Sequence, residues 1–343
     1  MGEKTNIEWC DSTINPTTGC DGCELWNGRD IRTCYAGNLH EARLAKSLPI
    51  LYAENFQEVR IASGRMAQAA RWPDLRGKDR PGKPWLNGFP RMIFVGDMGD
   101  FMSREVPDDY IENEIIGAIR SPEGSRHFWL LLTKQIRRLA DLSLKIGGLP
   151  DNCMAMTTVT DQTFAKKRIP DLIKVKCRWR GVSAEPLWGP VDFSEWMTPG
   201  GEALDSRDYY PDAPPGVYDE YLRCHVTEAF SEIDWVITGG ESEQSGDTQT
   251  KPSHPQWFRD IRDQCTAAGV PIFHKQNGDW WPSNYDATSP EWIAMSKAST
   301  SGQNLNHNGS IASMFRVGKA RAGRLLDGVE WNEMPDLPSL KGK

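Results

Sequence analysis

Short apolar runs alternate with helical stretches from residue 91 onward. The apolar runs predict buried strands at 92–95, 127–133, 153–159, 179–184, 234–238 and 270–274. Apolar residues at helical spacing predict helices at 108–120, 136–146, 163–175 and 254–268. A first strand is expected at about 12–15. Since helices between strands return the chain to the same edge of a sheet, the pattern predicts an α/β fold with a mostly parallel sheet, as in a partial or full (β/α) barrel.

Two stretches rich in glycine, proline and charge interrupt this rhythm, at about 72–90 and 198–232. We interpret both as insertions on the rim of the barrel. Residues from about 277 are expected to form a C-terminal extension, with a loop over 277–308. Because 343 residues suit one large barrel, we predict a single domain over 1–343.

Composition narrows the class of protein. The hydrophobic fraction is 38%, the charged fraction is 25%, and no apolar run reaches the roughly 18 residues of a membrane span. No secretory signal is visible, so a cytoplasmic location without a membrane partner is expected. The net charge of −7 argues against a protein that coats DNA non-specifically, although a local basic cleft stays possible.

The cysteines are concentrated near the start of the chain. Four of the eight fall within the first 34 residues, and Cys20 and Cys23, followed after ten residues by Cys34, form the candidate ligand set. Three thiolates predict a [4Fe–4S] cluster with one open iron, which would chelate S-adenosylmethionine, and Tyr35 would shield it. The alternative is a structural four-thiolate zinc site with Cys10 as the fourth ligand. The spacing of the cysteines alone favours neither the iron–sulfur cluster nor the zinc site.

Polar residues follow the predicted strands, at the rim where α/β barrels carry their sites. Asp97, Met98 and Asp100 follow the first of these strands and are candidates for the amino group of S-adenosylmethionine. The alternative is a turn with helix-capping acids. The ends of the predicted strands 153–159 and 179–184 offer further cofactor contacts, at Thr157, Thr158 and Asp161 and at Ser183.

Four charged residues at the same rim are candidates for catalysis. Lys134 would pair with a carboxylate of the cofactor or substrate, or would be a solvated lysine. Glu185 and Glu241 leave buried strands, where a carboxylate is costly unless it is paired or functional. Lys275 would neutralise Glu241 or bind substrate. Internal salt bridges are the alternative for both glutamates.

Basic and aromatic residues raise the question of nucleic acid. Cations are frequent at 166–180 and again at 316–324, which suits phosphate binding or a solvated helix face. Trp188, Trp280 and Trp281 fall in expected rim loops, where they would stack on a base. Core packing is the alternative.

Several phrases resemble a known family in one order along the chain. Among them are NPTTGC at 15–20, VSAEPL at 182–187, DWVITGGES at 234–242 and GRLLDG at 323–328. The chain is similar in these phrases to a phage-associated family of radical-SAM-like proteins, catalogued as a domain of unknown function. That family carries its middle cysteine a few residues before the last, whereas Cys23 lies near the first. Cys10 is therefore the reserve ligand.

The resemblance implies a radical SAM type barrel and a phage-encoded enzyme in the host cytoplasm. Phages hypermodify thymine, so the expected activity is a radical isomerase acting on glycine-modified thymine, in DNA or as the nucleotide. An electron donor and a later decarboxylase are expected partners. Lys134 or Lys275 would hold the glycyl carboxylate, and Glu185 or Glu241 its amine. The alternatives are a DNA-repair enzyme like spore photoproduct lyase and a non-catalytic, zinc-stabilised nucleic-acid binding protein.

Overall fold

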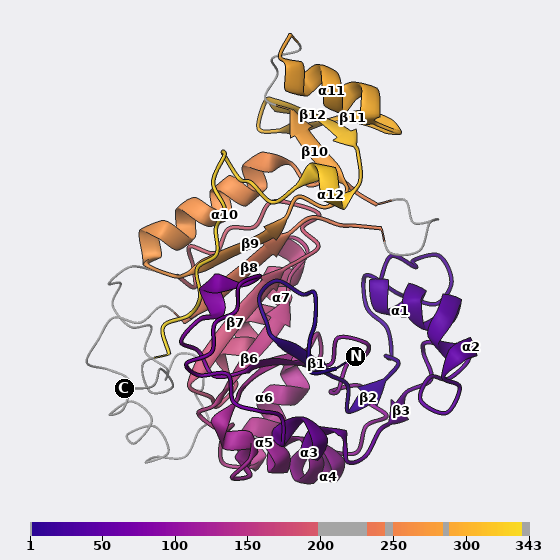
Figure 1. The fold of residues 1–343 in the computed structure, drawn as a ribbon, viewed down its shortest axis with the longest axis vertical. Helices are drawn as coiled ribbons and strands as arrows, with labels where there is room; N and C mark the ends of the chain where they lie inside the picture. Colours follow the sequence, from indigo (N-terminus) through magenta and orange to yellow (C-terminus); the bar gives the residue numbers. More distant parts are fainter. Residues whose placement is uncertain (1, 198–231, 244–249, 284–287, 338–343) are drawn as a thin grey trace.

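The fold is built on a curled parallel sheet. The computed structural model describes residues 2–197, 232–243, 250–283 and 288–337 (Figure 1). The seven strands of the main sheet follow the order β1-β4-β5-β6-β7-β8-β9. They are β1 (Ser12–Ile14), β4 (Met92–Val95), β5 (Phe128–Leu132), β6 (Cys153–Thr158), β7 (Trp179–Ala184), β8 (Trp235–Gly239) and β9 (Ile272–Gln276). Every neighbouring pair is parallel, and in the described part of the chain β1 and β9 are not paired. The predicted α/β fold is confirmed in the form of a half-barrel.

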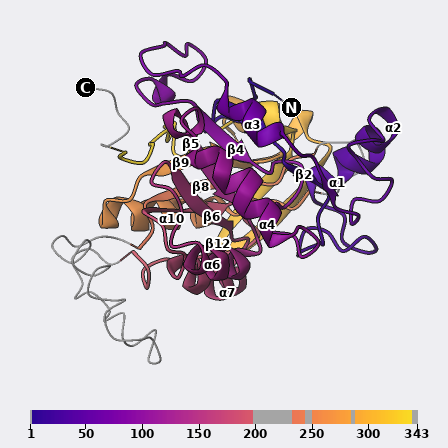
Figure 2. The same cartoon turned by 90° about the horizontal axis from the view of Figure 1, so that it is seen from below.

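Helices cover the outer face of the sheet (Figures 1 and 2). The main ones are α3 (Arg65–Ala70), α6 (Ile136–Lys145), α7 (Gln162–Ile173) and α10 (Pro255–Ala268). The helix predicted at 108–120 is present as α4 (Asp108–Tyr110), η3 (Ile111–Ile116) and α5 (Gly117–Arg120), and its middle segment η3 is π-helical. Short 3₁₀ turns occur at η2 (Pro84–Leu86) and η4 (Gly124–Arg126).

Successive strand residues point to opposite faces, and both faces are buried. In β4, Ile93 and Val95 belong to the apolar cluster beneath the helices, whereas Met92 and Phe94 belong to a second cluster on the inner side of the half-barrel. Burial on both faces explains why these strands appear in the sequence as continuous apolar runs.

The segment 72–90 lies at the amino ends of the strands. The Arg80 guanidinium donates 2.8 Å to the carboxylate of Asp11, which accepts the backbone N–H of Met92 at the start of β4. Leu86 and Phe89 pack into the inner cluster. This segment therefore closes the amino end of the half-barrel. The other predicted insertion, 198–232, lies outside the described residues except for Glu232.

Two regions flank the half-barrel. We call residues 17–61 the cysteine region. In chain order it holds β2 (Thr17–Thr18), α1 (Tyr35–Leu39), η1 (His40–Leu44), α2 (Ala45–Ser47) and β3 (Arg60–Ile61), and β2 pairs with β3 in a small sheet. The C-terminal extension holds β10 (Trp280–Ser283), α11 (Pro290–Ala298), β11 (Ser301–His307), β12 (Ser310–Arg316) and α12 (Lys319–Ala322). The loop predicted over 277–308 is therefore wrong, because β10 and β11 pair with β12 in an antiparallel sheet. Among the described residues, no helix is long and apolar enough to cross a membrane.

Candidate functional site

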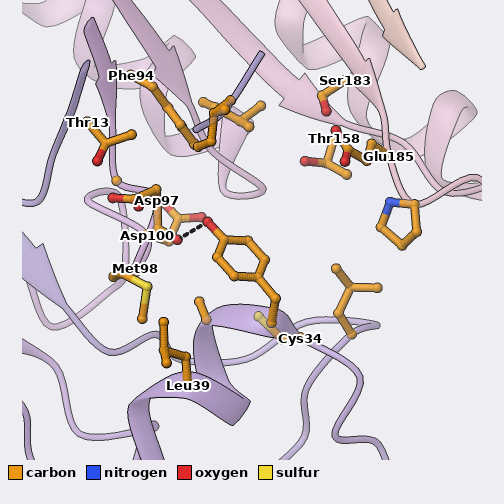
Figure 3. A pocket seen from close by; sticks show the side chains of 18 of the residues that line it. Thr13, Cys34, Leu39, Phe94, Asp97, Met98, Asp100, Thr158, Ser183 and Glu185 are labelled. Atoms are coloured by element: carbon orange, nitrogen blue, oxygen red, sulfur yellow. Dashed lines mark hydrogen bonds between the residues drawn. The ribbon is translucent and has the colours of Figure 1, made fainter. Parts of the chain in front are cut away.

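A cavity of about 690 Å³ opens at the carboxyl ends of the main strands. Its walls come from the cysteine region, the ends of β4 to β9 and the N-terminal segment 4–9. The predicted cluster ligands, cofactor contacts and catalytic candidates that line it are Cys20, Cys23, Cys34, Tyr35, Asp97, Met98, Asp100, Lys134, Thr158, Ser183, Glu185, Glu241 and Lys275. Thr157, Asp161, Trp188, Trp280 and Trp281 do not line it. Figure 3 shows Thr158, Ser183 and Glu185 grouped on one side of this cavity. Asp97, Asp100 and Met98 lie on the other side.

Three thiols share the cavity. Cys34 directly precedes α1, so the backbone N–H groups of Ala36 and Gly37 favour its thiolate, although burial has the larger effect and raises the pKa of the thiol. Burial also raises the pKa of Cys20 well above its usual value, and the nearby Asp100, Cys23 and Cys34 raise it further. The thiols are thus close enough to act on one another electrostatically.

The cavity offers three thiols, and Cys10 is not a fourth. Within the described part of the chain, no three cysteine, histidine or carboxylate side chains stand in a ready metal-binding group. Cys10 is fully buried in the inner apolar cluster and is absent from the cavity wall. A fourth thiolate is therefore not offered there by Cys10, and three cysteines at one cavity match the ligand set of a cluster with an open iron.

The two acidic residues after β4, Asp97 and Asp100, differ in their hydrogen-bond partners. Asp100 accepts hydrogen bonds from the Thr133 hydroxyl at 2.6 Å and from the backbone N–H groups of Met102 and Lys134, each at 3.0 Å. It therefore ties the end of β4 to the end of β5. Asp97 accepts from the Asn15 amide at 2.5 Å, and its backbone carbonyl accepts the Tyr35 hydroxyl. Burial raises the pKa of Asp97.

The two predicted lysines also differ. The Lys275 ammonium donates to the Glu185 carboxylate at 2.5 Å, and each side chain is 17% exposed. Burial lowers the pKa of Lys275, but Glu185 and other acidic neighbours outweigh burial and raise it. Among the described residues, the Lys134 ammonium makes no hydrogen bond. Burial lowers the pKa of Lys134, but the nearby Cys23 and Glu24 raise it by more. These two neighbours place Lys134 on the cysteine side of the cavity.

Glu241 is held by neighbours from the loop after β7 and from the segment that begins at Thr250. Its Oε2 accepts from the Trp188 indole N–H at 3.1 Å and from the backbone N–H of Lys251 at 2.8 Å. The Lys251 ammonium lies 3.9 Å from the centre of the Trp188 ring. Among the described residues Glu241 is not bonded to Lys275, so the predicted neutralisation of Glu241 by Lys275 is wrong. Lys275 pairs with Glu185 instead, which is the internal salt bridge considered as the alternative for that glutamate.

Some residues selected from the sequence have structural roles instead. Asp161 caps α7 by accepting the N–H groups of Thr163 and Phe164. Trp280 and Trp281 belong to the C-terminal sheet, where the Trp281 ring stacks on Phe315 at 6.3 Å. Neither lines the cavity, so the sequence-based suggestion that they stack on a base there is not supported.

Arg168, counted in the basic run 166–180, is buried. It pairs with Glu24, one residue after Cys23, through two hydrogen bonds of 2.7 Å. It is therefore not available for phosphate. No pattern in the sequence indicated this pair, or that segment 4–9 and Lys319 line the cavity. The Lys319 ammonium meets the Glu8 carboxylate at 3.2 Å beside the cavity.

Comparison with known proteins returns one family. A family model described as "Protein of unknown function (DUF5131)" matches residues 4–335. The comparisons with curated proteins and with solved structures gave no match.

Proposed function

We propose that this chain, which belongs to the DUF5131 family, is a radical SAM enzyme. The family description states no activity, so the proposal is argued from the site. The observation that carries the proposal is the convergence of three cysteines and several buried charged side chains on one cavity at the carboxyl ends of a parallel half-barrel. Cavities of this size take a cofactor or a small substrate.

Cys20, Cys23 and Cys34 would hold a [4Fe–4S] cluster. When bound and reduced, the cluster supplies one electron that cleaves S-adenosylmethionine into methionine and a 5′-deoxyadenosyl radical. Lys134, on the cysteine side, is suited to the carboxylate of the cofactor, and Asp97 to its amino group. Thr158 and Ser183 supply hydroxyl groups, and Tyr35 shields the cysteines from solvent.

The test is reconstitution under anaerobic conditions. We expect about four irons per chain, the content of one such cluster, and formation of 5′-deoxyadenosine from S-adenosylmethionine when dithionite is added. Stoichiometric zinc without iron after anaerobic purification would instead support the non-catalytic binding protein.

As the substrate we propose a thymine that carries glycine through nitrogen on its 5-methyl carbon, in phage DNA or as the nucleotide. In the rearrangement the bond from this carbon to nitrogen breaks and a bond to the glycyl α-carbon forms. The α-carbon loses one hydrogen and the nitrogen gains one, so the composition is unchanged. Acid–base chemistry removes hydrogen from such a carbon poorly at neutral pH, whereas a carbon radical does so readily.

Glu185, Lys275 and Glu241 would orient the amino-acid substituent, and a later decarboxylase would use the product. An external electron donor must supply the reducing equivalent. Incubation of the reconstituted protein with glycine-modified thymidine should give a product of equal mass and different retention. Formation of 5′-deoxyadenosine only with an unrelated metabolite would leave the radical SAM proposal intact and remove this substrate.

A further inference from the structure

Among the described residues, one buried carboxylate oxygen of Glu241 lacks a partner. Glu241 lines the cavity and is 6% exposed. Oε2 accepts two hydrogen bonds, but Oε1 is buried and accepts none among the described residues. A buried carboxylate oxygen without a partner has lost its hydrogen bonds to water without replacing them, which destabilises the fold. A donor that arrives with a ligand would remove this cost.

The backbone holds Glu241 in a fixed position. The N–H of Gly240 donates to the Gln276 carbonyl, and the Glu241 carbonyl accepts the N–H of Asp279, both at 2.9 Å. A Cβ at Gly240 would lie 2.3 Å from the carbonyl oxygen of Asn277, so only glycine allows this close approach. The carboxylate is therefore positioned before any ligand binds.

The other two glutamates that line the cavity have ion-pair partners: Glu185 pairs with Lys275 and Glu8 with Lys319. Among the described residues, Glu241 is the lining glutamate without an ion pair. A Cβ at Gly239 would lie 3.1 Å from the carboxyl carbon of Glu185, so this carboxyl group packs closely against the end of β8. Lys275 neutralises it. The two groups that bond Glu241 are neutral N–H donors. The Lys251 ammonium lies over the Trp188 ring and forms no ion pair with Glu241 among the described residues.

We infer that Glu241 binds a protonated amine of the substrate. This inference rests on the proposed function and deepens it, because it selects Glu241 over Glu185 as the group that recognises the amine. Charge-assisted hydrogen bonds are the strong ones, and a cavity that excludes water strengthens them. The substrate class is thus a thymine nucleoside or nucleotide whose 5-substituent carries an ammonium group.

Two nucleosides that differ in a single ammonium group test the inference. Binding of 5-aminomethyl-2′-deoxyuridine and of thymidine to the reconstituted protein is measured by calorimetry, with S-adenosylmethionine present. We expect the aminomethyl nucleoside to bind roughly ten- to hundredfold more tightly, the range for a hydrogen bond to a charged group. Equal affinities would overturn the inference.

Glu241→Gln is the matched variant. Glutamine keeps an acceptor for Trp188 and Lys251 but presents an N–H₂ donor where Oε1 stood, so the preference for the aminomethyl nucleoside should disappear. Glu243→Gln is the control, because Glu243 pairs with Arg316 and does not line the cavity. It should keep the preference. If Glu241→Gln fails to fold, equal affinities of the two nucleosides for the unaltered protein would still overturn the inference.

Failure of the inference and failure of the proposed function give different results. Formation of 5′-deoxyadenosine with dithionite and no nucleoside reports the cofactor chemistry alone. If that product forms and neither nucleoside binds, the thymine assignment fails and the role of Glu241 fails with it. If both nucleosides bind equally, the thymine assignment stands and only the role of Glu241 is lost.

Discussion

The buried pair of Arg168 and Glu24 should control the order of the cysteine region. The two side chains are 7% and 8% exposed, and two hydrogen bonds of 2.7 Å join them. Arg168 also donates to the Thr158 carbonyl at 2.9 Å and lies 4.6 Å from the centre of the Phe164 ring. Removing one partner of a buried pair costs about 3–5 kcal/mol, because the other charge stays buried and unpaired. We therefore expect Arg168→Met to destabilise the protein by that amount.

A pair with an exposed arginine, on the same loop as Glu24, supplies the control. Arg104 contacts Asp21 at 3.0 Å; the Arg104 side chain is 82% exposed, whereas Asp21 is 6% exposed and also accepts the backbone N–H of Arg104 at 3.2 Å. Solvent screens the Arg104 guanidinium and the backbone bond to Asp21 remains, so Arg104→Met should change stability less than Arg168→Met. Glu24→Gln and the double variant with Arg168→Met complete a cycle that isolates the coupling energy of the buried pair.

Two assays read the effect. Chemical denaturation gives the change in the free energy of unfolding, and trypsin cleavage after Arg29 reports opening of the loop between Cys23 and Cys34. If about 3 kcal/mol of local stability is lost, cleavage there should accelerate by roughly a hundredfold or more. The reasoning is refuted if Arg168→Met resembles Arg104→Met in both assays.

Two further predictions follow from burial. Alanine at any of the three cavity cysteines should abolish iron binding, whereas Cys10→Ala should retain it, since Cys10 does not line the cavity. Iron analysis after reconstitution measures this. Loss of iron in Cys10→Ala but not in Cys23→Ala would reassign the ligand. Burial lowers the pKa of His127 to about 4, so its neutral form stabilises the fold above pH 6.5. That contribution, up to about 3 kcal/mol, is lost as the pH falls from about 6.5 to 4, and denaturation midpoints of His127→Gln should depend less on pH across this window.

The sequence predicted the sheet well because its strands are buried on both faces. Runs such as the one in β5 are apolar at every position and contrast sharply with the helices between them. The candidate site was predictable for a related reason. The carboxyl ends of parallel strands meet at one edge, so Asp97, Lys134, Glu185 and Glu241, which each follow a strand, had to come together.

The C-terminal sheet was missed because its strands lack that signal. β11 consists of the residues SGQNLNH and is largely exposed, so neither apolar runs nor alternation marks it as a strand. The segment 4–9 and Lys319 were missed because nothing local in the sequence connects them with the cavity. The pair of Glu24 and Arg168 spans 144 positions, and each residue alone is typical of a solvated surface.

This pair also bears on the spacing of the cysteines. Cys23 lies three positions after Cys20 and eleven before Cys34. Glu24 follows Cys23 directly, and Arg168 joins it to the end of β6 through the Thr158 carbonyl. The half-barrel therefore holds the residue beside Cys23 directly, through contacts outside the loop that carries the cysteines.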